Sequence, residues 1–371
     1  MRDLPPLFPQ IGPITRYVLF ADFADLPPPP ISSWDGEVNI LAEHRLAATA
    51  LRLIHQNSLP VRRDTVRSLS AITLDWSLMT TALTERTTPF LELLRQRSHF
   101  ALIKGAGLAH FYPNPVERPY TDYDILVHPS AFSDTLSYLS AQGFFEREST
   151  RPPWPAFTRF CREAINLVTD TGARIDLHHH IPPWIWGQHL DPSTIAAHAT
   201  PTGPHALPVV APLDNYFIAA LHILSDNDAP GKTLRAWRDV LTLTQRLDTQ
   251  DIVSTASRLQ LTGILRWILS SLPAYVRPNL LISCLEEPRP EHPYRLAMRF
   301  RGNTFRSSPL TYPTRLPFSN ALYYALGMTL PPTPYLRSRY PDARHPLAAW
   351  WSDALGDVSW QVFGHSSSPT D

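Results

Sequence analysis

Near the middle of the chain, residues 122–127 read Asp-Tyr-Asp-Ile-Leu-Val. The apolar run from Ile125 to Val127 is typical of a buried strand. Because side chains alternate across a strand, Asp122 and Asp124 should point to the same face, with Cα atoms about 7 Å apart. Two carboxylates on one face repel each other unless a cation lies between them, and Mg²⁺ prefers such hard oxygen ligands. The stretch therefore predicts a strand that carries part of a metal site.

A third carboxylate, Asp176, falls in a second strand candidate. Residues 164–169 and 173–180 both have strand character, and Asp170-Thr171-Gly172 between them suits a hairpin loop with glycine at a positive φ. Three carboxylates on neighbouring strands can hold two Mg²⁺ ions about 4 Å apart, which suits in-line attack on a nucleotide phosphate. Asp176 could also accept the proton of the attacking hydroxyl. Asp-x-Asp is common by chance in loops, caps and solvated strand faces, so a structural role stays open as the alternative.

A glycine turn follows another apolar run, at residues 99–103. It reads Lys104-Gly105-Ala106-Gly107 and opens a short helical run. Glycine lets a backbone approach a phosphate closely, and the start of a helix favours an anion. The motif lacks the Gly-Lys-Ser/Thr ending of a P-loop and the third glycine of a dinucleotide-binding fingerprint. The chain has one other lysine, Lys232, so the placement of Lys104 favours a phosphate contact over a plain tight turn.

The run Asp176-Leu177-His178-His179-His180 supports a rival interpretation. On a strand, Asp176, His178 and His180 share one face, and Asp-x-His-x-His is a ligand set that zinc or iron can use in a hydrolase. A further ligand could come from another histidine, and the candidates are His189, His205 and His222. Buried, hydrogen-bonded histidines or a solvated strand edge remain the structural alternative.

The composition narrows the classes of protein to which the chain can belong. The chain has 371 residues, of which 43% are hydrophobic, enough for a substantial core. Its 33 basic and 33 acidic residues give a net charge of zero, so bulk charge does not indicate a nucleic-acid or anionic-membrane binder. A local basic patch could still bind nucleic acid. No apolar run is long enough for a membrane span and the start lacks a secretory signal, so we expect a cytoplasmic protein without membrane contact.

Proline content and hydrophobic periodicity divide the chain into four parts. Residues 1–97 read as a proline-rich arm, extended at Pro27–Pro30, followed by helical stretches after Asp35 and Asp64. Residues 98–185 mix strand and helix signals. Helical periodicity returns over 186–290, and 291–371 form an extension rich in proline and aromatic residues.

The order of these motifs resembles a nucleotidyltransferase family of the DNA polymerase β-like superfamily. Members carry a lysine-glycine turn, an arginine four residues before an Asp-x-Asp strand, a later Ile-Asp-Leu-His strand, then a histidine and an aromatic-x-Asp in successive helices, and a proline-tyrosine ending. The matching residues here are Lys104-Gly105-Ala106, Arg118, Asp122-Tyr123-Asp124, Ile175-Asp176-Leu177-His178, His222, Trp237-Arg238-Asp239 and Pro332–Tyr340.

The resemblance implies an α+β fold, in which a central mixed sheet is flanked by N-terminal and C-terminal helical regions. It also implies Mg²⁺-dependent transfer of a nucleoside monophosphate, from a triphosphate such as ATP, to a hydroxyl on a small molecule, peptide, protein or RNA. By position, Asp122, Asp124 and Asp176 would be the catalytic carboxylates and would bind two Mg²⁺ ions.

Other roles also follow from the resemblance. Lys104, Gly105 and Ala106 would bind the nucleotide, and His178 would be an accessory residue. Arg118 would either face the phosphates or pair with a carboxylate, since arginine suits both. The superfamily usually has glycine or serine where this chain has Ala106, so one phosphate contact is missing.

Two alternatives to the transferase are kept. One is the metal hydrolase built on Asp176, His178 and His180. The other is a non-catalytic module that binds a nucleotide and regulates a partner, although three intact carboxylates argue against a decayed site.

Overall fold

The computed structural model describes residues 10–30, 34–147, 164–181, 189–225, 233–285 and 342–352, together with Phe8, Gly187 and short pieces between 330 and 340. Most of the extension expected at 291–371 lies outside the described residues. Of the Pro332–Tyr340 motif, Thr333, Leu336, Arg337 and Tyr340 are described, and Lys232 is not.

A mixed seven-stranded sheet forms the centre, in the order β3-β4-β5-β2-β1-β7-β6. Neighbouring strands run antiparallel except for two parallel pairs, β2 with β5 and β1 with β7. The strands are β1 (Phe100–Leu102), β2 (Tyr123–Val127), β3 (Phe145–Glu146), β4 (Ala164–Val168), β5 (Arg174–His178), β6 (Thr200–Thr202) and β7 (Leu207–Val209). Helices flank this sheet, so the predicted α+β class is confirmed.

The hairpin between β4 and β5 forms where the sequence predicts it. Gly172 has φ +88°, a conformation that glycine adopts without strain, and its N–H donates to the Thr169 carbonyl at 2.9 Å. The hairpin pairs β4 with β5 in antiparallel register, and the other edge of β5 pairs with β2 in parallel register, with Asp124 opposite Asp176. Strands β6 and β7 also join the sheet, so it includes residues beyond the range 98–185 expected for the core.

Among the described residues, four helices precede the sheet, and they differ from the sequence prediction in two ways. They are α1 (Pro13–Phe20), α2 (Val38–Glu43), α3 (Ala47–Gln56) and α4 (Arg63–Arg95). The arm contains a helix, α1, which starts at a proline that needs no intrahelical N–H bond. The single amphipathic stretch expected after Asp35 is split by Arg45, whose φ is +57°.

The helical stretch expected after Asp64 is the long helix α4, which continues as far as Arg95. Pro89 lies inside it and removes the bond to the carbonyl of Glu85. Both residues are on the exposed side, where water can solvate that carbonyl, so the helix continues through the proline.

The remaining helices follow the sheet strands or form the C-terminal helical region. They are α5 (Lys104–Ala109), η2 (Pro115–Glu117), η3 (Pro129–Ala131), α6 (Phe132–Ala141), α9 (Pro192–Ala197), α10 (Pro212–Ser225), α11 (Thr233–Thr244), α12 (Thr249–Arg258), α13 (Thr262–Ser270) and α14 (Asn279–Cys284). Among the described helices, none combines the length and the apolar character that a membrane crossing needs.

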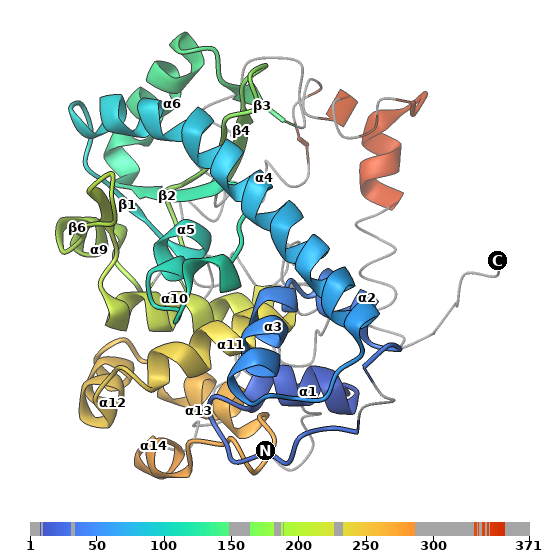
Figure 1. The fold of residues 1–371 in the computed structure, drawn as a ribbon. Helices are drawn as coiled ribbons and strands as arrows, with labels where there is room; N and C mark the ends of the chain where they lie inside the picture. The colour runs from blue at the N-terminus through green and yellow to red at the C-terminus, as the bar shows by residue number, and fades with distance from the viewer. Residues whose placement is uncertain are drawn as a thin grey trace.

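Alternation along β2 separates the core from the site. Tyr123, Ile125 and Val127 pack into an apolar cluster with α4 and α6. Asp124 and Leu126 lie on the other face, and Leu126 joins a cluster built largely from α1, α3 and α10 to α14. Figure 1 shows α4 over the sheet and these helices gathered in the other half of the molecule. Asp124 therefore faces the helical layer.

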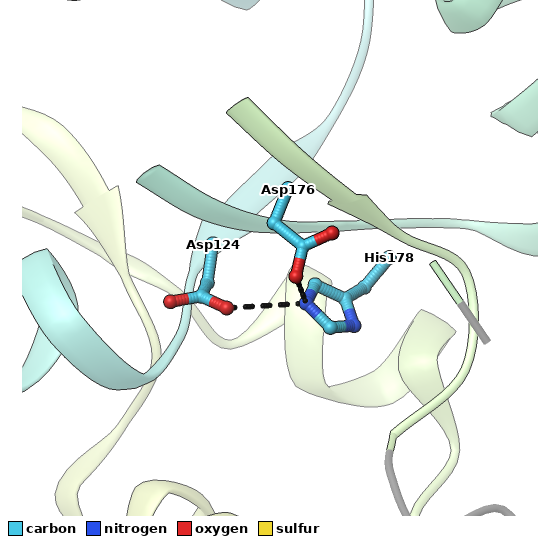
Figure 2. A group of neighbouring side chains, drawn as sticks. All are labelled: Asp124, Asp176 and His178. Carbon is cyan, nitrogen blue, oxygen red and sulfur yellow. Dashed lines mark hydrogen bonds and ion pairs between the residues drawn. The ribbon is translucent and has the colours of Figure 1, made fainter. Parts of the chain in front are cut away.

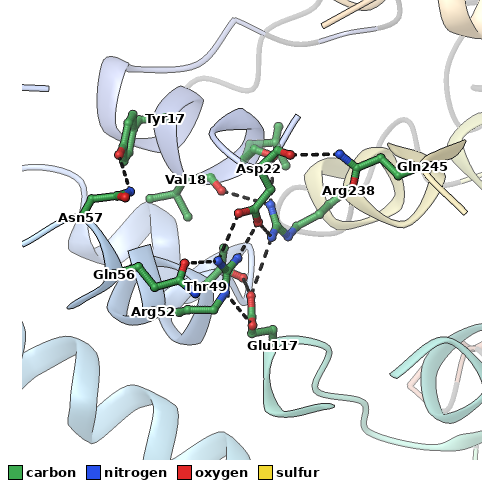
Figure 3. A network of polar contacts seen from close by, with 11 residues as sticks. Tyr17, Val18, Asp22, Thr49, Arg52, Gln56, Asn57, Glu117, Arg238 and Gln245 are labelled. Carbon is green, nitrogen blue, oxygen red and sulfur yellow. Dashed lines mark hydrogen bonds and ion pairs between the residues drawn. The ribbon is translucent and has the colours of Figure 1, made fainter. Parts of the chain in front are cut away.

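A buried polar network ties the N-terminal helices to the rest of the chain (Figure 3). Glu117 of η2 receives hydrogen bonds from Arg52 Nε at 2.8 Å and Thr49 Oγ1 at 3.0 Å, both from α3. Arg238 of α11 pairs with Asp22 and donates to the carbonyl of Leu19. Since Asp22 also pairs with Arg52, one network joins α1, α3, η2 and α11.

We expect Glu117→Gln to lower the free energy of unfolding by about 3 kcal/mol, because the guanidinium groups of Arg52 and Arg238 would face a neutral amide in the interior. Urea unfolding followed by circular dichroism measures the change. Asp64→Asn, in an exposed pair with Arg67, is the matched control and should leave the midpoint nearly unchanged. Equal losses in the two variants would contradict a structural role for this network.

Candidate active site

Asp124 and Asp176 face each other across adjacent parallel strands. They are direct partners in the β2–β5 register, and His178 lies two residues further along β5 on the same face. His178 Nε2 lies 3.2 Å from Asp124 Oδ1 and 3.1 Å from Asp176 Oδ2 (Figure 2). One ligand atom from each residue falls within 4.8 Å of the other two. The register of the two strands thus gathers a compact ligand set.

Positive charge compensates the two carboxylates. Burial alone would raise the pKa of Asp124, but Lys104 and the hydrogen bond with His178 bring it below its usual range. Burial alone would lower the pKa of His178, but the charge of Asp176 and the hydrogen bonds with both carboxylates raise it to about 9. The Nε2 proton of His178 therefore lies between two carboxylates, a position that a divalent cation could also use.

Asp122 lies close to this group without belonging to it. It directly precedes β2, in a bend, so strand alternation does not bring its carboxylate into the group of three. Burial, together with the charges of Asp124 and Asp176, raises the pKa of Asp122 above its usual range. Among the described residues, the predicted carboxylate triad is therefore a close pair joined by His178, with Asp122 beside it.

Lys104 occupies a strained position next to Asp124. Its φ is +49°, a left-handed conformation that costs a non-glycine residue about 1–3 kcal/mol and is concentrated at functional sites. Its side chain is nearly buried, and Nζ lies 3.4 Å from Asp124 Oδ1. The lysine thus supplies a positive charge at the edge of the carboxylate pair.

Close packing explains the two glycines of the turn. A Cβ on Gly105 would lie 2.9 Å from Tyr120 Cβ and 3.6 Å from Asp124 Oδ2, whereas a Cβ on Gly107 would lie 2.7 Å from the Leu102 carbonyl oxygen. Gly105 therefore borders the site. Ala106 packs its methyl group into the apolar cluster on the α4 side of the sheet, so its backbone is the part that could reach a phosphate.

Arg118 pairs with a carboxylate, which answers the question that the sequence left open. Its Nε lies 2.7 Å from Asp239 Oδ1 and its Nη2 lies 2.8 Å from Asp239 Oδ2, and both side chains are buried. The Tyr112 hydroxyl also donates to Asp239. The Trp237-Arg238-Asp239 motif of α11 thus anchors the loop that leads to Asp122.

The rival ligand set is not gathered in the described part of the chain. Strand β5 ends at His178, so alternation stops there and His180 does not join the group. His179 instead stacks on Phe132, with ring centroids 4.0 Å apart. Burial lowers the pKa of His180 to about 4. His205 is exposed and lies 3.6 Å from Glu92.

Three further residues lie near the site, of which the sequence marks His222 and does not mark the two arginines. His222 of α10 lies near enough to lower the pKa of Asp124, and Arg235 of α11 acts in the same way on Asp122. Arg235 and Asp239 are four residues apart on one helix face, so the aromatic-x-Asp motif could have pointed to Arg235. Arg45 is also electrostatically coupled to Asp122, and nothing in its local sequence marks it.

We expect Asp124→Asn to weaken Mn²⁺ binding by about 10-fold or more, because it removes charge from the centre of the ligand group. Asp122→Asn should weaken binding less, since its carboxylate lies outside that group. Titration calorimetry with Mn²⁺ on the purified protein measures both. Asp134→Asn on α6, an exposed acid, is the control, and an affinity unchanged in Asp124→Asn would contradict the assignment.

Comparison with known proteins agrees with this geometry. A family model described as an uncharacterised nucleotidyltransferase matches residues 31–275, a range that includes Lys104, Asp124, Asp176 and Asp239. No curated protein matches the chain. The resemblance seen in the order of the motifs is thereby confirmed at the level of the family.

Proposed function

The chain belongs to a family of uncharacterised nucleotidyltransferases, and we propose that it transfers a nucleoside monophosphate from a Mg²⁺-bound triphosphate to a hydroxyl acceptor. The observation that carries the proposal is the buried Asp124–Asp176 pair, set beside Lys104 and the Gly105 turn. Hydroxyl groups on a small molecule, peptide, protein or RNA all fit this chemistry.

The carboxylate pair fits a divalent cation. Asp176 Oδ1 is buried and receives no hydrogen bond from any described residue, and an unsatisfied carboxylate oxygen in the interior is costly. Asp124 and Asp176 would hold Mg²⁺, and Asp122 would extend the set enough for a second ion. When bound, Mg²⁺ supplies Lewis-acid stabilisation of phosphate oxygens and lowers the pKa of a bound hydroxyl.

Residues of the chain would supply the proton acceptor and the phosphate contacts. The acceptor oxygen attacks the α-phosphorus, the new O–P bond forms, and the bond to the leaving pyrophosphate breaks. Asp176 takes the hydroxyl proton, and the hydrogen bond from His178 orients its carboxylate. Lys104 places positive charge toward the phosphates, while the missing side chain of Gly105 leaves them room to approach.

Arg118 has a positioning role in this proposal. Its Nε and Nη2 donate to Asp239 and its Nη1 donates to the Pro119 carbonyl, so it holds the loop before β2 against α11. Asp122 is four residues further on, and its place beside the pair depends on that anchor.

We expect wild-type protein with Mg²⁺ and α-labelled nucleoside triphosphates to release pyrophosphate and label an acceptor supplied by a cell extract. Asp124→Asn should reduce the rate by about 100-fold or more, because the buried pair loses half its charge. EDTA should have the same effect, and Asp134→Asn should match the wild type. Labelling that persists in Asp124→Asn would contradict the mechanism, and nucleotide binding without any product would favour the regulatory module.

A further inference from the structure

Arg45 lies in the turn between two N-terminal helices, and its side chain stacks on a third. It occupies the turn between α2 and α3 with φ +57°, and its N–H donates to the Ala42 carbonyl at 3.0 Å. Its guanidinium lies over the ring of Trp76 in α4, with Cζ 4.4 Å from the ring centroid. Such stacking fixes the plane of the guanidinium and leaves the N–H groups at its edge available to an anion.

The charge of Arg45 lies close to that of Asp122. Burial is the main reason that the pKa of Arg45 is below its usual value, and the nearby charge of Arg118 adds to the effect. Asp122 opposes both, so its carboxylate lies within electrostatic reach of the arginine. They are not an ion pair, because no Arg45–carboxylate contact within 4 Å occurs among the described residues.

Other arginines near the site have partners that Arg45 lacks. Arg52, Arg118 and Arg238 each pair with carboxylates of the fold. No described residue accepts a hydrogen bond from the Arg45 side chain. A half-buried guanidinium without acceptors loses solvation and gains little in return, and an anion at its free edge would supply those acceptors.

The face of α4 next to Arg45 leads toward the glycine turn. Trp76, Thr80 and Thr84 recur every four residues along this helix. Thr84 Oγ1 lies 3.2 Å from the hydroxyl of Tyr120, whose Cβ lies against Gly105. Thr80 Oγ1 is buried and has no hydrogen-bond partner among the described residues. A polar stripe therefore connects Arg45 with the place proposed for the phosphates.

We propose that Arg45 binds the β- and γ-phosphates of the nucleoside triphosphate, and this inference rests on the proposed function. A planar guanidinium with free edges matches phosphate oxygens in a two-pronged contact. The triphosphate is the anion that the proposed reaction brings next to Asp122. Arg45 would also stabilise the charge that develops on the leaving pyrophosphate.

The test compares binding by wild-type protein, Arg45→Gln and Arg45→Lys. Probes are the α,β-methylene analogues of ATP, CTP, GTP and UTP, inorganic tripolyphosphate, and the matching monophosphates, each titrated with Mg²⁺ by calorimetry. We expect Arg45→Gln to weaken analogue and tripolyphosphate binding by about 10-fold and to leave monophosphate binding unchanged. Arg45→Lys should be intermediate, since lysine keeps the charge without the fork.

Arg67→Gln is the matched control, because Arg67 is exposed on α4 and pairs with Asp64. It should bind every probe as the wild type does. Tight analogue binding that is equal in wild type and Arg45→Gln would overturn the inference and leave the proposed function standing. Equal weakening of triphosphate and monophosphate binding would also overturn it, and a wild type that binds no probe would overturn both proposals.

Discussion

The site depends on how two like charges are kept together in the interior. Parallel pairing of β2 and β5 sets Asp124 directly opposite Asp176, and repulsion between them would be strong in a buried environment. His178 and Lys104 supply the compensating charge, one from the same strand and one from the turn after β1. The sheet therefore creates an arrangement that is stable only with cations beside it, and this is the property a metal-dependent phosphate chemistry needs.

A second constraint fixes the loop that carries Asp122. Arg118 and Asp239 are 121 residues apart in sequence and make a buried, two-pronged contact. Next to it, Glu117 is held by α3, and Arg238 is held by Asp22. The adjacent residues Glu117 and Arg118 are thus bound to different helices, Glu117 to α3 and Arg118 to α11. Breaking either tie would leave buried charge without a partner, so the loop has little freedom to move away from the sheet.

Local rules carried the prediction of the sheet and the carboxylates. Alternation predicted the strand of Asp124, and the Asp170-Thr171-Gly172 loop predicted the hairpin that carries Asp176. The parallel pairing that sets the two carboxylates opposite each other is a long-range contact that these rules do not give. The same rules misplace features that depend on distant contacts. Helical periodicity continues across Arg45, so the sequence gives no sign of the break there, where the Leu46 N–H donates to the Leu41 carbonyl. Alternation alone would also put His180 with His178, but β5 ends first. The sequence could not decide whether Arg118 binds a phosphate or a carboxylate, because arginine suits both equally.

The N-terminal helices belong to the site and are more than a support for it. The family match begins at residue 31, ahead of the sheet, and includes all of α2, α3 and α4. These helices contribute the packing that buries one face of β2, the partners of Glu117, and the Trp76 ring under Arg45. Arg45 stacks on Trp76 within electrostatic reach of Asp122 and has no carboxylate partner among the described residues, so the edge of its guanidinium is open to an anion. Arg45 would bring positive charge toward the carboxylates from the turn between α2 and α3, and Lys104 brings it from the turn after β1. A polyanionic substrate requires positive charge of this kind beside the carboxylates.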